Sequence, residues 1–149
     1  MPIANTDIQF FKSTKVGSLG GAITANAVSN TANDLFAKVS GDEAASGSTK
    51  YKCIYVKNAH TSLTLENAKI FIETNTPSDD TVVEIGIGSS GVNGTEQQVA
   101  DVNTAPADVT FDLAEDKANA LAIGNLANGD HIAVWIKLTV AAGSAAHNG

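Results

Sequence analysis

The sequence predicts an all-β fold, arranged as a single β-sandwich or barrel, on the basis of three observations. Short stretches rich in β-branched residues alternate apolar with polar positions. Segments rich in Gly, Asn, Asp and Ser separate these stretches at roughly regular spacing. The length of 149 residues suits one domain, and a chain that is 43% hydrophobic and only 17% charged is too apolar to stay disordered.

The clearest predicted strand covers residues 131–140, HIAVWIKLTV, directly after the tight-turn sequence Asn128-Gly129-Asp130. Apolar residues alternate along it, which predicts one fully buried face. Trp135 falls on the opposite face, where we expect it to pack in an interface or against a neighbouring loop. The buried face consists of Ile132, Val134, Ile136, Leu138 and Val140.

The second clear strand covers residues 50–58, KYKCIYVKN. Apolar side chains fall on both of its faces, so this strand is predicted to be central in its sheet. They are Ile54 and Val56 on one face and Tyr51, Cys53 and Tyr55 on the other. The single cysteine of the chain, Cys53, rules out an intrachain disulfide and is expected to be buried and unreactive.

Shorter patterns of the same kind predict further strands at 8–11, 21–24, 63–65, 68–73, 81–88 and 108–113. The first two are expected to pair at sheet edges, and the third is expected to lead into the fourth.

Helix content is predicted to be small. Residues 112–123 contain helix formers, and Asp112 with Glu115 imitates a capping box, so one short helix or none is expected there. Residues 30–39 could hold another helical turn. Loops are predicted by composition at 40–49, 74–80, 89–94 and 103–107.

Two segments together resemble bacterial immunoglobulin-like sandwich domains. The first is the strand from Tyr51 to Asn58, which runs into a polar corner and a paired strand. The second is IGNLANGD at 123–130, followed by the alternating strand. In this resemblance Leu126 plugs the end of the core and Gly129 turns the chain into its last strand.

The resemblance implies a single immunoglobulin-like β-sandwich with at most one or two short helical turns and extended terminal arms. Its core is expected to cover residues 50–140. Residues 1–49 would supply an N-terminal arm and the first edge strands, and residues 141–149 would form a C-terminal tail.

The whole chain is similar to small structural proteins of tailed-bacteriophage virions, through the segments 8–13, 20–23, 92–97 and 135–143. This similarity implies a place in a virion assembled in the host cytoplasm. By size, a capsid decoration or cement protein fits best, one that binds the outer capsid surface and stabilises the shell. Its expected partners are the major capsid protein and copies of the chain itself, as a trimer or an oligomer matched to the lattice.

The net negative charge of the chain argues against nucleic acids and anionic membranes as partners. All nine basic residues are lysines, and 16 acidic residues bring the net charge to −7. Binding to a phosphate backbone needs a basic footprint, so we expect no nucleic acid and no anionic membrane surface as a partner. The first residues do not resemble a signal peptide, and no apolar run is long enough to span a bilayer.

No motif predicts catalysis, a cofactor or a metal. The histidines lack the spacing of a zinc site; they are His60, His131 and His147. Residues 86–91, GIGSSG, are not followed by a helix, so they predict a hairpin loop rather than a nucleotide-binding loop. Asp112, Glu115 and Asp116 lack the order of a calcium loop and are expected to form a solvated acidic surface.

The candidate partner-binding residues are Ile3, Ile8, Phe10, Phe11 and Trp135. The first four place apolar groups within eleven residues of the start. As an arm they could insert into a hydrophobic groove of a partner, with the two phenylalanines as anchors. Alternatively, Ile8 to Phe11 form the first edge strand of the same domain.

A carbohydrate- or receptor-binding module of a phage tail or bacterial surface assembly is the alternative function. Tyr51, Tyr55 and Trp135 could then form an aromatic platform for a sugar. This alternative requires Trp135 or a tyrosine to be exposed to solvent.

Overall fold

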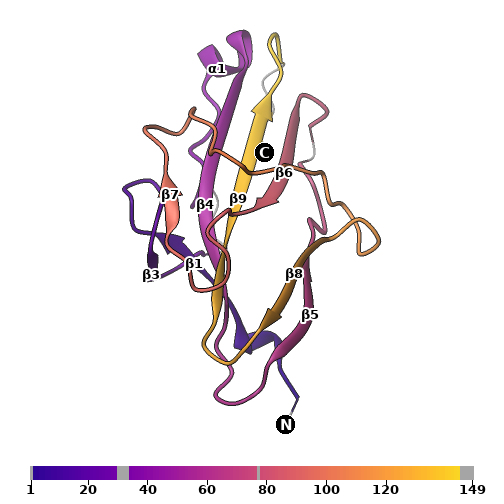
Figure 1. Ribbon diagram of the computed structural model, residues 1–149. Coiled ribbons are helices and arrows are strands. Elements are labelled where there is room, and N and C mark those ends of the chain that lie inside the picture. Colours follow the sequence, from indigo (N-terminus) through magenta and orange to yellow (C-terminus); the bar gives the residue numbers. More distant parts are fainter. Residues whose placement is uncertain (1, 30–33, 77, 145–149) are drawn as a thin grey trace.

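The computed structural model describes residues 2–29, 34–76 and 78–144. Within this part of the chain a five-stranded antiparallel sheet forms the centre, in the order β3-β1-β4-β9-β6 (Figure 1). Two ribbons lie beside it, β2 with β7 and β5 with β8. The nine strands are β1 (Ile8–Ser13), β2 (Gly20–Gly21), β3 (Ile23–Ala27), β4 (Ser48–Asn58), β5 (Leu65–Ile70), β6 (Thr81–Ile87), β7 (Glu96–Gln98), β8 (Leu121–Leu126) and β9 (His131–Val140). The predicted all-β sandwich is confirmed.

The pair β4–β9 is the longest in the sheet and lies in its middle. Its register runs without a shift from Ser48 opposite Val140 to Lys57 opposite His131. Because successive side chains on a strand point to opposite faces, this pair supplies apolar groups to both sides of the sheet. The prediction that residues 50–58 form a central strand is therefore confirmed.

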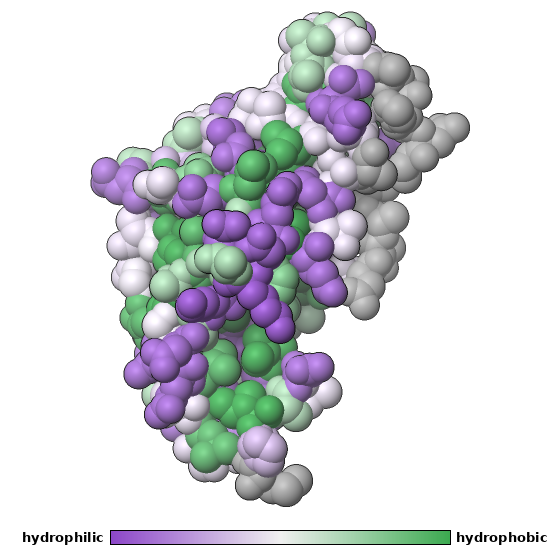
Figure 2. Space-filling view, turned by 90° about the vertical axis from the view of Figure 1, so that its right-hand side faces the viewer, coloured by the Kyte–Doolittle hydropathy of each residue, from purple (hydrophilic) through white to green (hydrophobic). Residues whose placement is uncertain are grey.

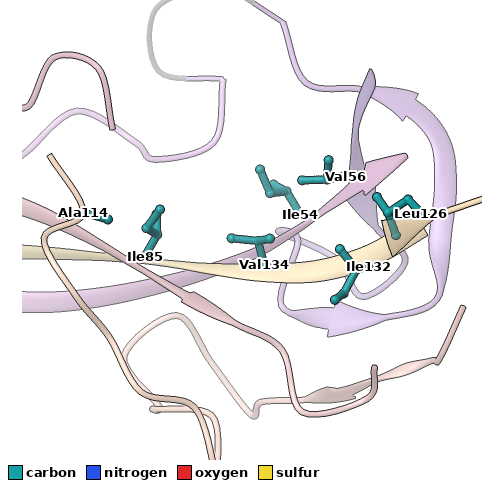
Figure 3. Packing of buried hydrophobic residues seen from close by; sticks show 7 residues of the cluster. All are labelled: Ile54, Val56, Ile85, Ala114, Leu126, Ile132 and Val134. Atoms are coloured by element: carbon teal, nitrogen blue, oxygen red, sulfur yellow. The ribbon is translucent and has the colours of Figure 1, made fainter. Parts of the chain in front are cut away.

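One face of the sheet packs against the β5–β8 ribbon. Figure 3 shows the seven buried side chains of this first cluster: Ile54, Val56, Ile85, Ala114, Leu126, Ile132 and Val134. Around them the apolar residues of the ribbon, such as Ile70 and Leu121, are only partly buried. In agreement, hydrophobic residues remain visible between hydrophilic ones on the side of β5, β6 and β8 (Figure 2).

The opposite face carries a second buried cluster. It consists of Leu19, Cys53, Tyr55, Val99, Ala133 and Trp135. The segment between β7 and β8 covers it, through the partly buried side chains of Val102, Val109 and Phe111. The sequence predicted only one fully buried face for residues 131–140, but the structure buries both faces because this second layer covers Ala133 and Trp135.

The segment between β7 and β8 wraps around the outer edge of β6. Its first half crosses the sheet in Figure 1, and the backbone of Asp112 then bonds to that of Ile85 in both directions. Two residues later Ala114 is already buried in the first cluster, and its carbonyl accepts from the backbone N–H of Ile72. The chain thus passes from one face to the other at Asp112.

This wrapping explains one difference from the sequence predictions and decides between one short helix and none at 112–123. Residues 108–113 form a single bridge at Asp112 rather than a strand. No helix forms at 112–123, because Ala114 adopts a left-handed backbone with φ 44° and β8 begins at Leu121. The apolar residues Val109 and Phe111 alternate with polar ones because their side chains pack against the second cluster. This alternation is not caused by strand pairing.

The only α-helix in the described residues is α1 (Gly41–Ser46), within a segment predicted as a loop. Ser40 and Glu43 form a reciprocal capping box, in which each side chain accepts from the other residue's backbone N–H. The spacing Ser-x-x-Glu is readable in the sequence and was the missed signal. A 3₁₀ turn, η1 (Asn5–Asp7), is the other helical element. The helical turn predicted at 30–39 lies partly outside the described residues.

Hydrogen bonds of the Asn58 side chain join the corner between β4 and β5 to the corner before β9. Its fully buried side-chain amide donates to the carbonyls of Leu63 at 2.8 Å and Leu126 at 2.9 Å, and its carbonyl oxygen accepts from the backbone N–H of His60. Leu126 is itself fully buried, and Gly129 turns the chain with φ 83°. The roles predicted for Leu126 and Gly129 are confirmed.

Replacing Asn58 by alanine should lower the free energy of unfolding by about 2–4 kcal/mol, because the buried carbonyl of Leu126 and the partly buried bond to Leu63 would lose their donor. Chemical denaturation of the variant and the wild type measures the difference. Asn128→Ala is the matched control, since exposed Asn128 donates only one bond of 3.4 Å, to Thr61. An equal loss in both variants would show that the buried amide has no special role.

Candidate functional site

The N-terminal candidates do not form a free arm. β1 lies between β3 and β4, so Ile8, Phe10 and Phe11 belong to the interior of the main sheet. Ile8 packs against the first cluster, and Phe11 lies opposite Tyr55 in the register. The edge-strand alternative is also corrected, because the edge on this side is β3. The sheet encloses β1 because β4 pairs with one of its edges and β3 pairs with the other.

Two of these residues remain accessible for a partner. The Phe10 side chain is 41% exposed although its strand is internal. Ile3 lies before η1 and is partly exposed. The prediction of a partner contact therefore narrows to Ile3 and Phe10.

The aromatic candidates are enclosed. Trp135 is 0% exposed in the second cluster, because the β7–β8 connection covers the face on which it lies. A partner therefore cannot contact this side chain on the folded chain, which corrects its placement among the binding residues. Tyr55 is also fully buried, and Tyr51 packs against Phe111 with ring centroids 5.6 Å apart. The structure does not assemble an aromatic platform from these three residues.

A polar hollow of about 300 Å³ opens at the end of β1 that leads into β2. Its walls come from β1 and the turn that follows, from β3, and from β4. Three lysines line it: Lys12 on β1, Lys15 in the turn and Lys52 on β4. One third of the lysines in this acidic chain therefore gather around one hollow.

The turn beside the hollow is held from several sides. The backbone N–H of Ser18 donates to Lys15, and the Ser13 hydroxyl donates to Cys53 at 2.9 Å. Gly17 has φ 83° and Ser18 has φ 57°, a left-handed pair that reverses the chain sharply. Such a turn is preorganised, so little conformational entropy would be lost when it binds.

Val16 stands at the tip of this braced turn. Its side chain is 91% exposed, the most exposed large apolar group in the described residues. It lines the hollow together with the lysines. An apolar side chain held outward by a rigid turn and surrounded by charged groups has the composition of a protein-binding anchor.

The hollow carries excess positive charge. Lys12 forms an ion pair of 2.8 Å with Asp34, whereas Lys15 and Lys52 donate to the backbone carbonyls of Val99 and Gly17, both at 2.5 Å. In the described part of the chain neither of these two lysines has a carboxylate within ion-pair distance. Three lysines thus face one aspartate, which makes the hollow suitable for a carboxylate or another anion.

The surroundings shift the pKa values of two of these groups. Burial lowers the pKa of Lys52, and the nearby charges of Lys50 and Lys12 lower it further. The hydrogen bond from Lys12 lowers the pKa of Asp34. Asp34 is thus paired with Lys12, whereas the charges that act on Lys52 are those of other lysines.

Sequence reasoning missed this hollow because its three lysines are not a motif. Lys12 and Lys15 are neighbours in sequence, but Lys52 is brought to them only by the pairing of β1 with β4. The readable signal was the turn sequence TKVGS, in which a valine next to a glycine is an unusual choice for an exposed tip.

The side chain of Glu96 is buried next to the second cluster, and the backbone N–H of Glu96 donates to the Tyr55 hydroxyl. Glu96 is 3% exposed, and its carboxylate accepts from the Ser89 hydroxyl at 3.1 Å and from the backbone N–H of Gln97 at 2.9 Å. Gly88 makes room for it, since a Cβ there would fall 1.8 Å from Glu96 Oε2. The segment 86–91 is thus a turn as predicted, but it connects β6 to β7 of a different sheet instead of closing a hairpin.

No group of three His, Cys, Asp or Glu side chains in residues 2–29, 34–76 and 78–144 is arranged to hold a metal ion. His60 and His131 lie in different corners of the fold, and His147 lies outside the described residues. None of the helices that the structure describes has the length and apolar character needed to cross a bilayer.

Cys53 should be nearly unreactive in the native protein. Burial raises the pKa of its thiol to about 12, and the charge of Glu96 contributes. Alkylation with iodoacetamide at mildly basic pH should therefore be at least about a hundred-fold slower than in the unfolded chain, since only the thiolate reacts. Equal rates with and without denaturant, followed by mass spectrometry, would contradict this burial.

His131 should make the protein less stable in mild acid. Burial lowers the pKa of His131 and the charge of Lys57 lowers it further, while Asp130 acts in the opposite direction. The unfolded chain therefore binds the proton more readily, so the stability that neutral His131 contributes is present above about pH 6.5 and is lost as the pH falls below it.

Thermal melting from about pH 7.5 to about pH 5.5 measures this dependence. His131→Gln should flatten the decrease relative to wild type, and His60→Gln serves as the control with a second histidine removed. A wild-type decrease that survives unchanged in His131→Gln would contradict the assignment.

No protein family, no curated protein and no solved structure matches the chain. The immunoglobulin-like character and the similarity to phage virion proteins therefore stay predictions from sequence motifs. What the chain is shown to be is an all-β sandwich with a lysine-lined hollow beside an exposed valine.

Proposed function

We propose that this chain is a non-enzymatic virion structural protein of the capsid decoration type, which binds the outer surface of a capsid shell and stabilises it. The observation that carries the proposal is the Phe10 side chain, which is 41% exposed although its strand β1 lies inside the main sheet. Rigid elements that hold apolar groups outward favour docking against another protein. The sequence similarity to virion proteins supplies the class of partner.

In this proposal the shell contact lies on the Phe10 side, with Ile3 beside the start of the same strand. β1 is fixed between β3 and β4, so Phe10 reaches a partner without an ordering step. Many copies on a repeating shell would add their contacts, and modest single-copy affinity would then suffice for stable coverage. The carbohydrate-binding alternative has less support, since Trp135 and Tyr55 are fully buried and Tyr51 packs against Phe111.

Phe10→Ser should weaken binding to shells about tenfold, because loss of one exposed anchor removes about 1–2 kcal/mol of contact. Co-sedimentation of the purified chain with shells of the major capsid protein from the same genome measures the bound fraction. Gln9→Ser is the matched control, since Gln9 is an exposed residue of the same strand that points to the other face.

Circular dichroism checks that both variants keep the β fold. Wild-type chain that stays in the supernatant while the shells pellet would overturn the proposal. Equal binding of Phe10→Ser and Gln9→Ser would remove Phe10 from the contact.

A further inference from the structure

A second surface of the chain complements the lysine-lined hollow. It is the segment 112–116, DLAED, in which Asp112, Glu115 and Asp116 are exposed. Leu113 stands between them and is 46% exposed. Like the hollow, this segment combines an accessible apolar side chain with charges of one sign.

The charges of the two surfaces are opposite and similar in size. The hollow has three lysines and one aspartate, and the acidic segment has three carboxylates beside Lys117. The partners already present do not neutralise the segment: Glu115 accepts from the Asn75 amide at 3.4 Å, and Asp116 accepts from Asn119. Among the described residues, none of the three carboxylates forms an ion pair.

The fold places these surfaces at opposite edges of the main sheet. The hollow is formed at the β3-β1-β4 side, while Asp112 is bonded to β6 at the other edge. The acidic segment belongs to the side that faces the viewer in Figure 2. Since the two surfaces are far apart on one chain, they cannot meet within it, but the segment of one copy can reach the hollow of another.

We infer that copies of this chain associate head to tail, with the acidic segment 112–116 of one copy seated at the Lys12–Lys15–Lys52 hollow of the next. Leu113 then packs against Val16, and Glu115 or Asp116 supplies the carboxylate that Lys52 lacks. The contact is heterologous, because two different surfaces meet. The inference deepens the proposed assembly role and rests on it for its biological setting.

Charge reversal gives a direct test. Lys52→Glu takes the net charge of the hollow from +2 to 0, and Glu115→Lys takes that of the segment from −2 to 0. Each variant alone therefore loses the charge attraction of the head-to-tail contact. In an equal mixture the unchanged hollow of one variant meets the unchanged segment of the other, and the two substituted side chains have opposite charges, so association should return. Sedimentation velocity at low ionic strength measures the size distribution of each sample.

The wild type should show concentration-dependent association that weakens when salt is raised to about 0.5 M, because screening shortens the reach of the charges. Each single variant should associate at least about tenfold more weakly than wild type. Val16→Asp should weaken the association independently of the lysines. Because the Val16 side chain is 91% exposed, this substitution does not endanger folding. Lys69→Glu and Asp42→Lys, at exposed sites outside both surfaces, are the matched controls and should associate like wild type.

A wild type that is monomeric at low salt would overturn the inference, and so would a mixture of Lys52→Glu and Glu115→Lys no larger than its components. These outcomes are separate from the shell experiment. Shell binding by a monomeric chain would leave the decoration role standing while removing the head-to-tail contact. Self-association without shell binding would do the reverse.

Discussion

The whole fold depends on the pairing of β4 with β9. These two strands share one unshifted register over their length, and β1 pairs with β4 while β6 pairs with β9, so that β3 is attached through β1. Their alternation sends Ile54 and Val134 to one face and Tyr55 and Trp135 to the other, so each face needs its own cover. The β5–β8 ribbon and the β7–β8 connection provide these covers, which makes this sheet a layer buried on both sides.

Strong local patterns made part of this fold predictable. Residues 50–58 and 131–140 alternate over many positions, and the IGNLANGD corner places a buried leucine and a turning glycine at fixed spacing. The remaining strands are short, and their pairing depends on residues far away in the chain. β2 is two residues long, and the first residues of β8, 121–123, end a segment whose Ala and Leu residues also suit a helix until the tertiary partner β5 is considered.

The candidate site was harder to predict than the fold for the same reason. A lysine is ordinarily a solvated surface residue, and only the β1–β4 register shows that Lys12 and Lys52 share a hollow. The apolar residues at the start of the chain suggested an arm, but a hydrophobic pattern cannot tell a partner's groove from the chain's own sheet. Phe10 has both properties: its backbone belongs to the chain's own sheet, and its side chain is exposed to a partner.

The position of Trp135 has a practical consequence. It is the sole indole of the chain, and it lies in the buried layer between the sheet and the β7–β8 connection, next to Cys53 in the second cluster. Its emission should be that of an apolar environment and should report on the integrity of this layer. Docking at the hollow or along β1 would leave the fluorescence unchanged, so a red shift upon adding any ligand would signal opening of the interior.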